Sequence, residues 1–269
     1  MNTNSINTHS KDHSPTTSAA NTPYPVALVS GGNRGIGLQV AKDLATQGFT
    51  VLIGSRDLAK GRDAAAEVAE TAVAIQLDVT DESSITDAVA RIDSEFGRLD
   101  VLINNAGVSF LGDQSTPLQE RASSGLLTNA PLDYVKRIYE INVFGVIALT
   151  QALLPLLRAT EGSRIVNVGS GGGSLAANAD PENPHRRMFG VYSASKTALH
   201  AISLAFATAL EPEGIPVNTV DPGMTATALN DFQGTKSIEE GAAHIVEVAL
   251  RGAGAPTGTF TSDEGTVPW

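Results

Sequence analysis

Residues 25–37 read Pro-Val-Ala-Leu-Val-Ser-Gly-Gly-Asn-Arg-Gly-Ile-Gly, and the rest of the chain is organised around this stretch. The apolar run predicts a buried strand, the glycines predict a tight turn, and the apolar spacing after Gly35 predicts a helix. Glycines let a diphosphate approach the main chain, and the helix dipole attracts it. Tight loops also use glycine for steric reasons alone, so the turn is a hypothesis for nucleotide binding. The residues expected around the diphosphate are Gly31, Asn33, Arg34, Gly35, Ile36 and Gly37.

The length and composition of the chain limit the class of protein to which this loop belongs. A chain of 269 residues with 42% hydrophobic residues is typical of one globular α/β domain. The formal net charge of −11 argues against nucleic acid and anionic membranes as partners, because both reward clustered Lys and Arg. The chain has no cysteine, which excludes disulfides and thiolate metal sites, and we predict no metal site. This composition is compatible with a cytoplasmic protein, which is our expectation.

The first 23 residues differ from the rest in composition. They are rich in Asn, Ser and Thr and hold almost no large apolar side chains, which predicts a disordered tail at 1–23 and a catalytic domain at 24–269. His9 and His13 are interpreted as parts of a solvated tail, with metal binding as the alternative. We find no apolar signal segment and expect no uninterrupted apolar run long enough to span a bilayer.

From Val26 onward, apolar strand-like runs alternate with longer helical patterns. This alternation predicts an α/β fold in which a doubly wound parallel sheet of about seven strands carries helices on both faces. Asp57 is expected to cap the second helix. After the first strand, the expected strands are 50–55, 72–78, 100–104 and 164–170, and the expected helices are 35–47, 58–70, 82–96, one opened by Pro131, and 192–210.

The end of the second strand bears on the choice of cofactor. A dinucleotide-binding fold that uses NAD normally presents an acidic residue there to the adenosine ribose. Here Ser55 and Arg56 hold that place, and Arg34 in the glycine loop can reach the same region. An Arg offers a 2′-phosphate a planar, permanently charged fork. We therefore predict NADP(H), with the alternative that either arginine is only a solvated surface charge.

Tyr192 and Lys196 lie one helical turn apart, and Ser170 ends the fifth predicted strand. In a doubly wound sheet, that strand end faces the crevice where cofactor and substrate meet. The segments 141–157 and 192–210 are nearly free of charge, so they need cover on two sides. We expect the sheet on one side and a second copy of the chain on the other, giving a dimer or a tetramer.

In these motifs the chain resembles the short-chain dehydrogenase/reductase family from about Val26 to the C-terminus. The loop Ser30-Gly31-x3-Gly35-Ile36-Gly37 matches the family's glycine motif, with Ser in place of Thr. The resemblance implies a Rossmann-type fold and a catalytic Ser170, Tyr192 and Lys196, with Tyr192 and Lys196 also touching the cofactor. It further implies a catalytic Asn142 and cofactor contacts from Asp78, Val79, Asn105, Ala106, Gly107, Pro222, Gly223, Thr225 and Thr227.

Carbonyl reduction needs an acid beside the developing alkoxide, and Tyr192 is the candidate. We expect the charge of Lys196 to lower the pKa of that phenol and its ammonium to bond the nicotinamide ribose, while Ser170 bonds the substrate oxygen. The resemblance implies that Asn142 orders a water behind Lys196. The alternative is that Asn142 only bends its helix.

Two departures from the family pattern concern the substrate end. Ser170 and Tyr192 are 22 positions apart, which is longer than usual for the family, and residues 179–187 form a polar insert between them. Whether this insert rims the pocket is left open by the sequence. The segment 108–130 is also long and polar, as access-shaping loops often are. Because relatives with larger inserts include monomers, a monomer remains an alternative.

Three functions are compatible with the sequence. The first is an NADPH-dependent reductase of ketones or aldehydes, which also runs in reverse. The second is an NAD-dependent secondary-alcohol or steroid dehydrogenase. The third is a non-catalytic NADP-sensing or interaction protein, and the intact Ser170, Tyr192 and Lys196 argue against it. The identity of the substrate has no readable code in the variable loops.

Overall fold

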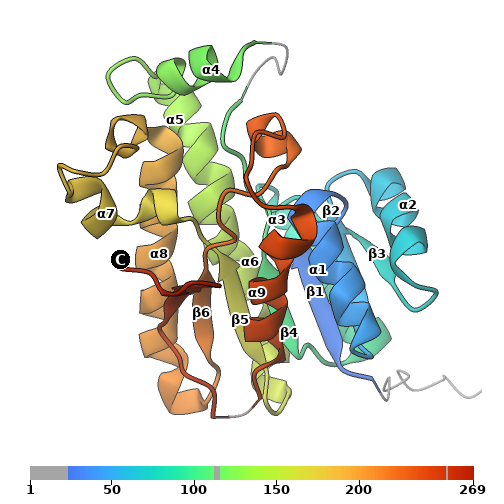
Figure 1. The fold of residues 1–269 in the computed structure, drawn as a ribbon. Coiled ribbons are helices and arrows are strands. Elements are labelled where there is room, and N and C mark those ends of the chain that lie inside the picture. The colour runs from blue at the N-terminus through green and yellow to red at the C-terminus, as the bar shows by residue number, and fades with distance from the viewer. Residues whose placement is uncertain (1–23, 112–115, 253) are drawn as a thin grey trace, which may run out of the picture.

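The computed structural model describes residues 24–111, 116–252 and 254–269. Figure 1 shows one sheet with helices packed on both of its faces. The predicted disordered tail lies outside the described residues, so the division into tail and domain stays a prediction.

The sheet has eight strands in the order β3-β2-β1-β4-β5-β6-β7-β8. Neighbouring strands from β3 to β7 pair in parallel, and β8 pairs antiparallel with β7. The predicted doubly wound parallel sheet is confirmed, with β8 as an added antiparallel edge. The strands are β1 Val26–Ser30, β2 Thr50–Ser55, β3 Val73–Gln76, β4 Val101–Asn104, β5 Arg164–Val168, β6 Val217–Val220, β7 Phe260–Ser262 and β8 Gly265–Thr266.

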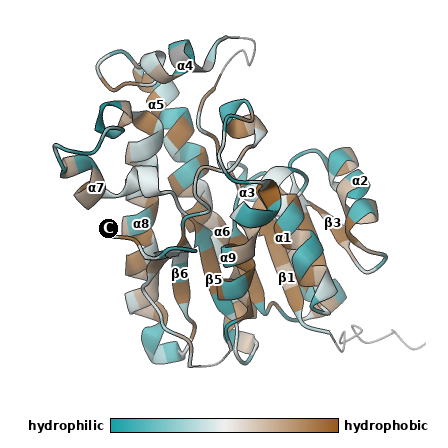
Figure 2. Cartoon of the chain, viewed as in Figure 1, coloured by the Kyte–Doolittle hydropathy of each residue, from teal (hydrophilic) through white to brown (hydrophobic). Residues whose placement is uncertain are grey.

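Every residue of β1, β2 and β4 is buried, as expected for parallel strands that are covered on both faces. Successive residues of β1 point to opposite faces, so Leu28 joins one apolar cluster and Val29 joins the other. Figure 2 shows the strands as a mostly hydrophobic layer and the helices with both hydrophobic and hydrophilic sides. Two continuous cores therefore fix the sheet between its helices.

The helices divide between the two apolar clusters. Side chains of α1, α2 and α9 belong to one cluster, and those of α3, α6 and α8 belong to the other. α5 leads into α6, and α4 lies beyond the carboxyl ends of the strands (Figure 1). The helices are α1 Gly35–Thr46, α2 Leu58–Val68, α3 Glu82–Phe96, α4 Leu118–Ser124, α5 Leu132–Tyr139, α6 Gly145–Ala159, α7 Leu175–Ala179, α8 Val191–Leu210 and α9 Ile238–Leu250.

Several predicted boundaries need correction. α2 ends at Val68 instead of residue 70, because Ala69 is extended. β3 is shorter than predicted at both ends. β5 ends at Val168 instead of Ser170, because the Ser170 N–H turns away from the sheet and donates to the Nε2 atom of His200. Ser170 therefore lies in a turn beyond the strand.

The helix predicted from Pro131 runs continuously over Leu132–Ala159 through a π-helical turn, η1, at Glu140–Phe144. By length and composition it is apolar enough to cross a membrane, although charged residues, among them Lys136, Glu140 and Arg158, interrupt its apolar sequence. Half of its most apolar window is buried inside the fold. The segment packs against α3 and α8, as a core helix does.

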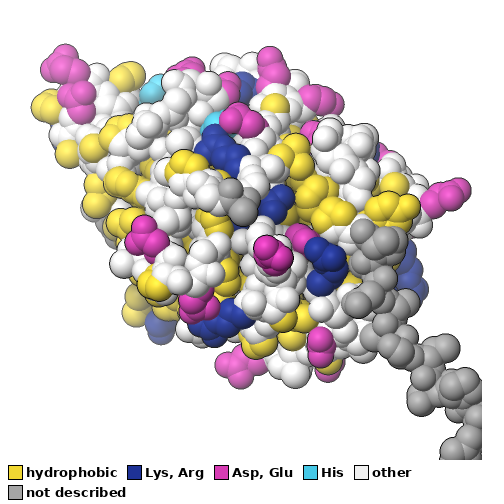
Figure 3. Space-filling view, turned by 90° about the horizontal axis from the view of Figure 1, so that it is seen from below, with side chains coloured by type: hydrophobic (Ala, Val, Ile, Leu, Met, Phe, Trp, Pro, Cys, Tyr) yellow, Lys and Arg dark blue, Asp and Glu magenta, His cyan; other side chains and the backbone are white. Residues whose placement is uncertain are grey.

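Figure 3 shows the end of the molecule where the strands begin. Basic and acidic side chains alternate on this face, among scattered apolar ones. The strands end on the opposite side of the molecule, where the crevice of a doubly wound sheet is expected.

Candidate active site

The glycine loop connects β1 to α1, and its first turn lies against the end of β4. A Cβ atom at Gly37 would stand 2.4 Å from Asn105 Nδ2 and 2.7 Å from the Gly31 oxygen, so only glycine fits there. Asn105 Nδ2 donates to the main-chain oxygens of Ser30 and Gly31 at 2.9 and 3.2 Å. The Ser30 hydroxyl accepts from the N–H groups of Asn105 and Ala106, each at 3.1 Å. The Ser30 hydroxyl thus ties the glycine loop to the residues that follow β4.

The amino end of α1 has no side-chain cap, because Arg34 occupies the cap position without a capping hydrogen bond. Gly35 has a φ of +55°, which turns the chain into the helix. The first N–H groups of α1 therefore face a cavity of about 450 Å³ and are available to an anion.

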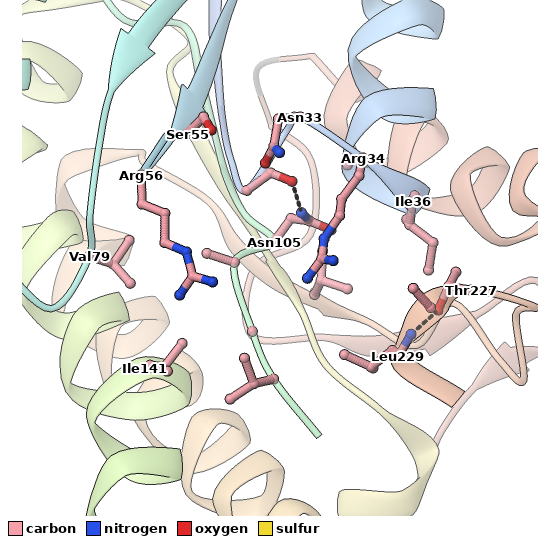
Figure 4. A pocket seen from close by; sticks show the side chains of 18 of the residues that line it. Asn33, Arg34, Ile36, Ser55, Arg56, Val79, Asn105, Ile141, Thr227 and Leu229 are labelled. Carbon is pink, nitrogen blue, oxygen red and sulfur yellow. Dashed lines mark hydrogen bonds between the residues drawn. The ribbon is translucent and has the colours of Figure 1, made fainter. Parts of the chain in front are cut away.

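Two guanidinium groups project into that cavity. Figure 4 shows Arg34 and Arg56 reaching into it from neighbouring loops. Within the described part of the chain, no ion pair involves either of them. Lys60, which the sequence analysis missed, lines the same end of the cavity. It lies one turn into the helix that Asp57 caps, which is the signal that would have found it.

Asp57, which follows Arg56 in the sequence, also lines the cavity. Its carboxylate accepts the N–H groups of Ala59 and Lys60 at 3.1 and 3.2 Å, as predicted for a helix cap. The hydrogen bond from the Lys60 N–H is the main cause of its lowered pKa. Asp57 also faces Lys60 Nζ at 3.6 Å. This acid is therefore engaged with its own helix.

The other end of the cavity is lined by Tyr192 and Lys196 on α8. Lys196 Nζ lies 5.9 Å from the centre of the Tyr192 ring and donates to the Val168 oxygen at 2.8 Å. Ser170 is hydrogen-bonded through its side chain to Tyr192, and its Oγ also accepts the Gly172 N–H at 3.2 Å. The three predicted catalytic side chains are therefore brought together.

The pKa of Tyr192 differs from our expectation. Its pKa is raised to about 12, and the main cause is burial; the hydrogen bond with Ser170 acts to lower the pKa, and the charge of Asp221 acts to raise it. Burial lowers the pKa of Lys196 to about 8, against the opposing charge of Asp221. The expected lowering of the Tyr192 pKa by Lys196 is therefore wrong for this structure, in which desolvation is the dominant cause.

Asn142 lies in the π-helical turn η1 and is fully buried. Its Nδ2 donates to the Val108 oxygen at 2.8 Å and to Ser195 Oγ at 3.0 Å, and its Oδ1 accepts the Val108 N–H at 2.9 Å. Asn142 therefore ties the segment after β4 to the helix that carries Tyr192. The irregular turn agrees with the helix-bending interpretation, and the water it was expected to order stays a prediction.

Most of the predicted cofactor residues line this one cavity. Asp78, Val79 and Pro222 are among them, and Thr227 lines it while its hydroxyl accepts the Leu229 N–H at 3.2 Å (Figure 4). The predicted residues outside the lining are Asn142, Ser170, Gly223 and Thr225. Thr225 is buried, and its hydroxyl donates to the Pro222 oxygen at 3.0 Å, so it supports the loop.

The two long polar segments, 108–130 and 179–187, contribute little to the cavity lining. Residues 179–187 are not part of the cavity lining, and Val108 is the only described residue of 108–130 that lines it. The segment 108–130 is instead linked to the loop after β6. Arg121 pairs with Asp231, and Ser109 Oγ donates to the Leu229 oxygen at 2.8 Å. Leu229 and Phe232 of that loop line the cavity.

Comparisons with known proteins agree with this geometry. The short chain dehydrogenase family matches residues 25–237. Short-chain dehydrogenase anuI of Penicillium roqueforti is 34% identical over 254 residues, which is 90% of this chain and 96% of that protein. The solved structure of salutaridine reductase from Papaver somniferum superposes with a TM-score of 0.73 at 29% identity and covers 89% of this chain and 100% of that one.

A Pseudomonas aeruginosa structure described as an RhlG/NADP active-site complex superposes with a TM-score of 0.70 at 27% identity. It covers 91% of this chain and 96% of its own. With a glycine loop, a cavity at the strand ends and a Tyr–Lys pair on one helix, the chain belongs to the short-chain dehydrogenase/reductase family of oxidoreductases.

Proposed function

We propose that this protein is an NADP(H)-dependent reductase that converts a ketone or aldehyde to an alcohol and also runs in reverse. The observation that carries the proposal is one cavity with Arg34 and Arg56 at one end and Tyr192 and Lys196 at the other. The first pair suits a 2′-phosphate, and the second suits proton transfer to a carbonyl oxygen.

The residues divide the chemistry as follows. The bound cofactor would supply the hydride that adds to the carbonyl carbon. Tyr192 gives its hydroxyl proton to the developing alkoxide, and Ser170 donates a hydrogen bond to the same oxygen. The raised pKa of Tyr192, caused chiefly by burial, keeps that proton in place for reduction at neutral pH. Lys196 is assigned to the ribose hydroxyls of the cofactor, beside Asn142 and Gly107.

The same phenol acts as base in the reverse direction, where it takes the proton from an alcohol. Because burial opposes the phenolate, oxidation should need a higher pH than reduction. The proposal therefore favours reductase activity near neutral pH.

The test is a screen of carbonyl compounds with NADPH and NADH, followed at the nicotinamide absorbance band. Tyr192→Phe should lower kcat by at least about a hundredfold while NADPH still binds. Lys196→Met should lower kcat and also weaken NADPH. The matched control Tyr139→Phe, outside the cavity lining, should retain activity. Near-normal turnover of the Tyr192 variant would contradict the mechanism.

One observation favours a second candidate, an NAD-dependent secondary-alcohol or steroid dehydrogenase. Asp57 lines the adenosine end of the cavity, where an acid would bind ribose hydroxyls. Its carboxylate is already bonded to two N–H groups of α2, which makes this the weaker candidate. Higher kcat/KM with NADH than with NADPH would establish it.

The proposal extends to the setting of the enzyme. We expect a cytoplasmic protein that acts on a small molecule and forms a homo-oligomer, with a monomer as the alternative. Phe144 and Leu204 leave 52% and 43% of their surfaces exposed on the long apolar helices. Sedimentation at several protein concentrations would measure the oligomeric state.

A further inference from the structure

His200 lies one helical turn after Lys196 on α8 and is only 3% exposed. The loop 169–173, which carries Ser170, wraps around its ring. A Cβ atom at Gly169 would stand 2.8 Å from His200 Nε2, and one at Gly173 would stand 2.9 Å from Cε1. Those glycines therefore leave the space that the imidazole fills, and the ring forms the floor under this loop.

The ring makes one hydrogen bond to the loop, and it comes from the main chain of Ser170. The Ser170 N–H donates to His200 Nε2 at 3.3 Å. Nε2 must therefore be unprotonated, which puts the proton of the neutral ring on Nδ1. In the described parts of the chain, Nδ1 has no hydrogen-bond partner.

The groups around the imidazole keep it neutral. Burial, with a smaller contribution from the charge of Lys196, lowers the pKa of His200 to about 3. The imidazole also packs against the rings of Phe260 and Trp269, whose centres lie 4.3 and 6.1 Å from its own. Asp221 acts electrostatically on the Lys196 and Tyr192 beside it. Nε2 therefore remains a hydrogen-bond acceptor at every pH at which the enzyme is expected to work.

The far side of the loop is held by Trp269. Its main-chain oxygen accepts the Ala176 N–H at 2.9 Å and the Ser174 hydroxyl at 3.4 Å. Its indole packs on Phe260, with ring centres 5.4 Å apart, and Phe260 packs on His200. The loop 169–173 is thus held between α8 on one side and Trp269 on the other.

We propose that His200 is a positioning residue that sets the Ser170 hydroxyl toward the substrate oxygen by holding the Ser170 main chain. This inference rests on the proposed function, because it assigns His200 a part in the same carbonyl reduction. His200 does not line the cavity and its acceptor is occupied by the main chain, so it acts through Ser170 and not as an acid or base.

The test is a double-mutant cycle. His200→Leu should lower kcat by about tenfold to a hundredfold, the cost of a small misplacement of a reacting group, with the NADPH dissociation constant within about twofold of wild type. In a Ser170→Ala background, the same change should cost no further activity, because the group that it positions is gone. His244→Leu, on α9, is the matched control and should leave kcat unchanged.

Equal losses from His200→Leu in both backgrounds would overturn the inference. An inactive wild type against every carbonyl tested would instead count against the proposed function. A second measurement needs no activity and no variant: nitrogen NMR of the wild-type imidazole should show the tautomer protonated at Nδ1, unchanged from pH 5.5 to pH 8. A ring protonated at Nε2 would refute the contact with Ser170, even if His200→Leu failed to fold.

Discussion

His200→Leu should also change how stability depends on pH. In the native protein, burial lowers the pKa of this histidine from 6.5 to about 3. Between those values the unfolded chain binds a proton that the folded chain does not. Acid therefore favours unfolding, and stability rises with pH through this window. The direction follows from the lowered pKa of a basic group.

The magnitude follows from the two pKa values. Lowering the pH from 7 to 5 protonates most of the unfolded histidine and almost none of the folded one, which costs about 2 kcal/mol of unfolding free energy. Leucine fills a similar apolar space and does not titrate. The variant should therefore lose about 2 kcal/mol less than wild type between pH 7 and pH 5, whatever its stability at pH 7.

The assay is urea unfolding of both proteins at each pH, followed by circular dichroism, with the free energies extrapolated to zero urea. Carboxylates that titrate in the same interval contribute equally to both proteins and cancel in the comparison. His185→Leu, which removes an exposed histidine, is the control and should lose as much as wild type. Equal losses in wild type and His200→Leu would refute the reasoning that the fold keeps this imidazole neutral.

Three further predictions concern the cofactor, the lysine and the tail. Arg56→Asp should move the ratio of kcat/KM for NADPH and NADH toward NADH by at least about tenfold, because it replaces the cation that we propose binds the 2′-phosphate by an anion. Arg62→Asp, outside the cavity lining, should leave that ratio unchanged, and steady-state kinetics measure both. The rate of NADPH-dependent reduction should fall as the pH rises through about 8. Lys196, with its pKa lowered to about 8, loses its charge there while Tyr192 stays protonated. A constant rate from pH 7 to pH 10 would contradict this. Deleting residues 1–22 should leave the melting temperature and turnover unchanged, because that segment can bury almost no apolar surface, and a lower melting temperature in calorimetry would show that it docks.

The secondary structure was predictable where local chemistry marks it. α3 has the predicted bounds because Asp81 accepts the Ser83 N–H at 2.9 Å at its start and Gly97 adopts a φ of +65° at its end. β2 also has its predicted bounds. β5 was predicted too long, because a distant side chain, His200, accepts the N–H of Ser170 and takes it out of the sheet. A local pattern does not contain that partner.

In the candidate site, too, the features marked by local sequence were predictable and the contacts between distant residues were not. The glycine loop, Arg34, Arg56 and the Tyr192–Lys196 pair are short motifs, and their positions in the cavity follow from strand and helix geometry alone. The links that close the substrate end join residues far apart in sequence. Arg121 and Asp231 are 110 positions apart, and no charge pattern near either one identifies the other. Such pairs come only from the packed structure.

The acidity of Tyr192 shows why a motif can be located correctly and its electrostatics still be misjudged. A Lys four positions away on a helix suggests a lowered phenol pKa, because opposite charges stabilise each other. The packing of the site has the opposite effect. Lys196 Nζ donates a hydrogen bond to the Val168 oxygen. Burial of the pair raises the pKa of Tyr192 and lowers the pKa of Lys196. Both shifts favour the neutral form of each group. The fold therefore keeps the Tyr192 proton at neutral pH, and the proposed carbonyl reduction would consume that proton.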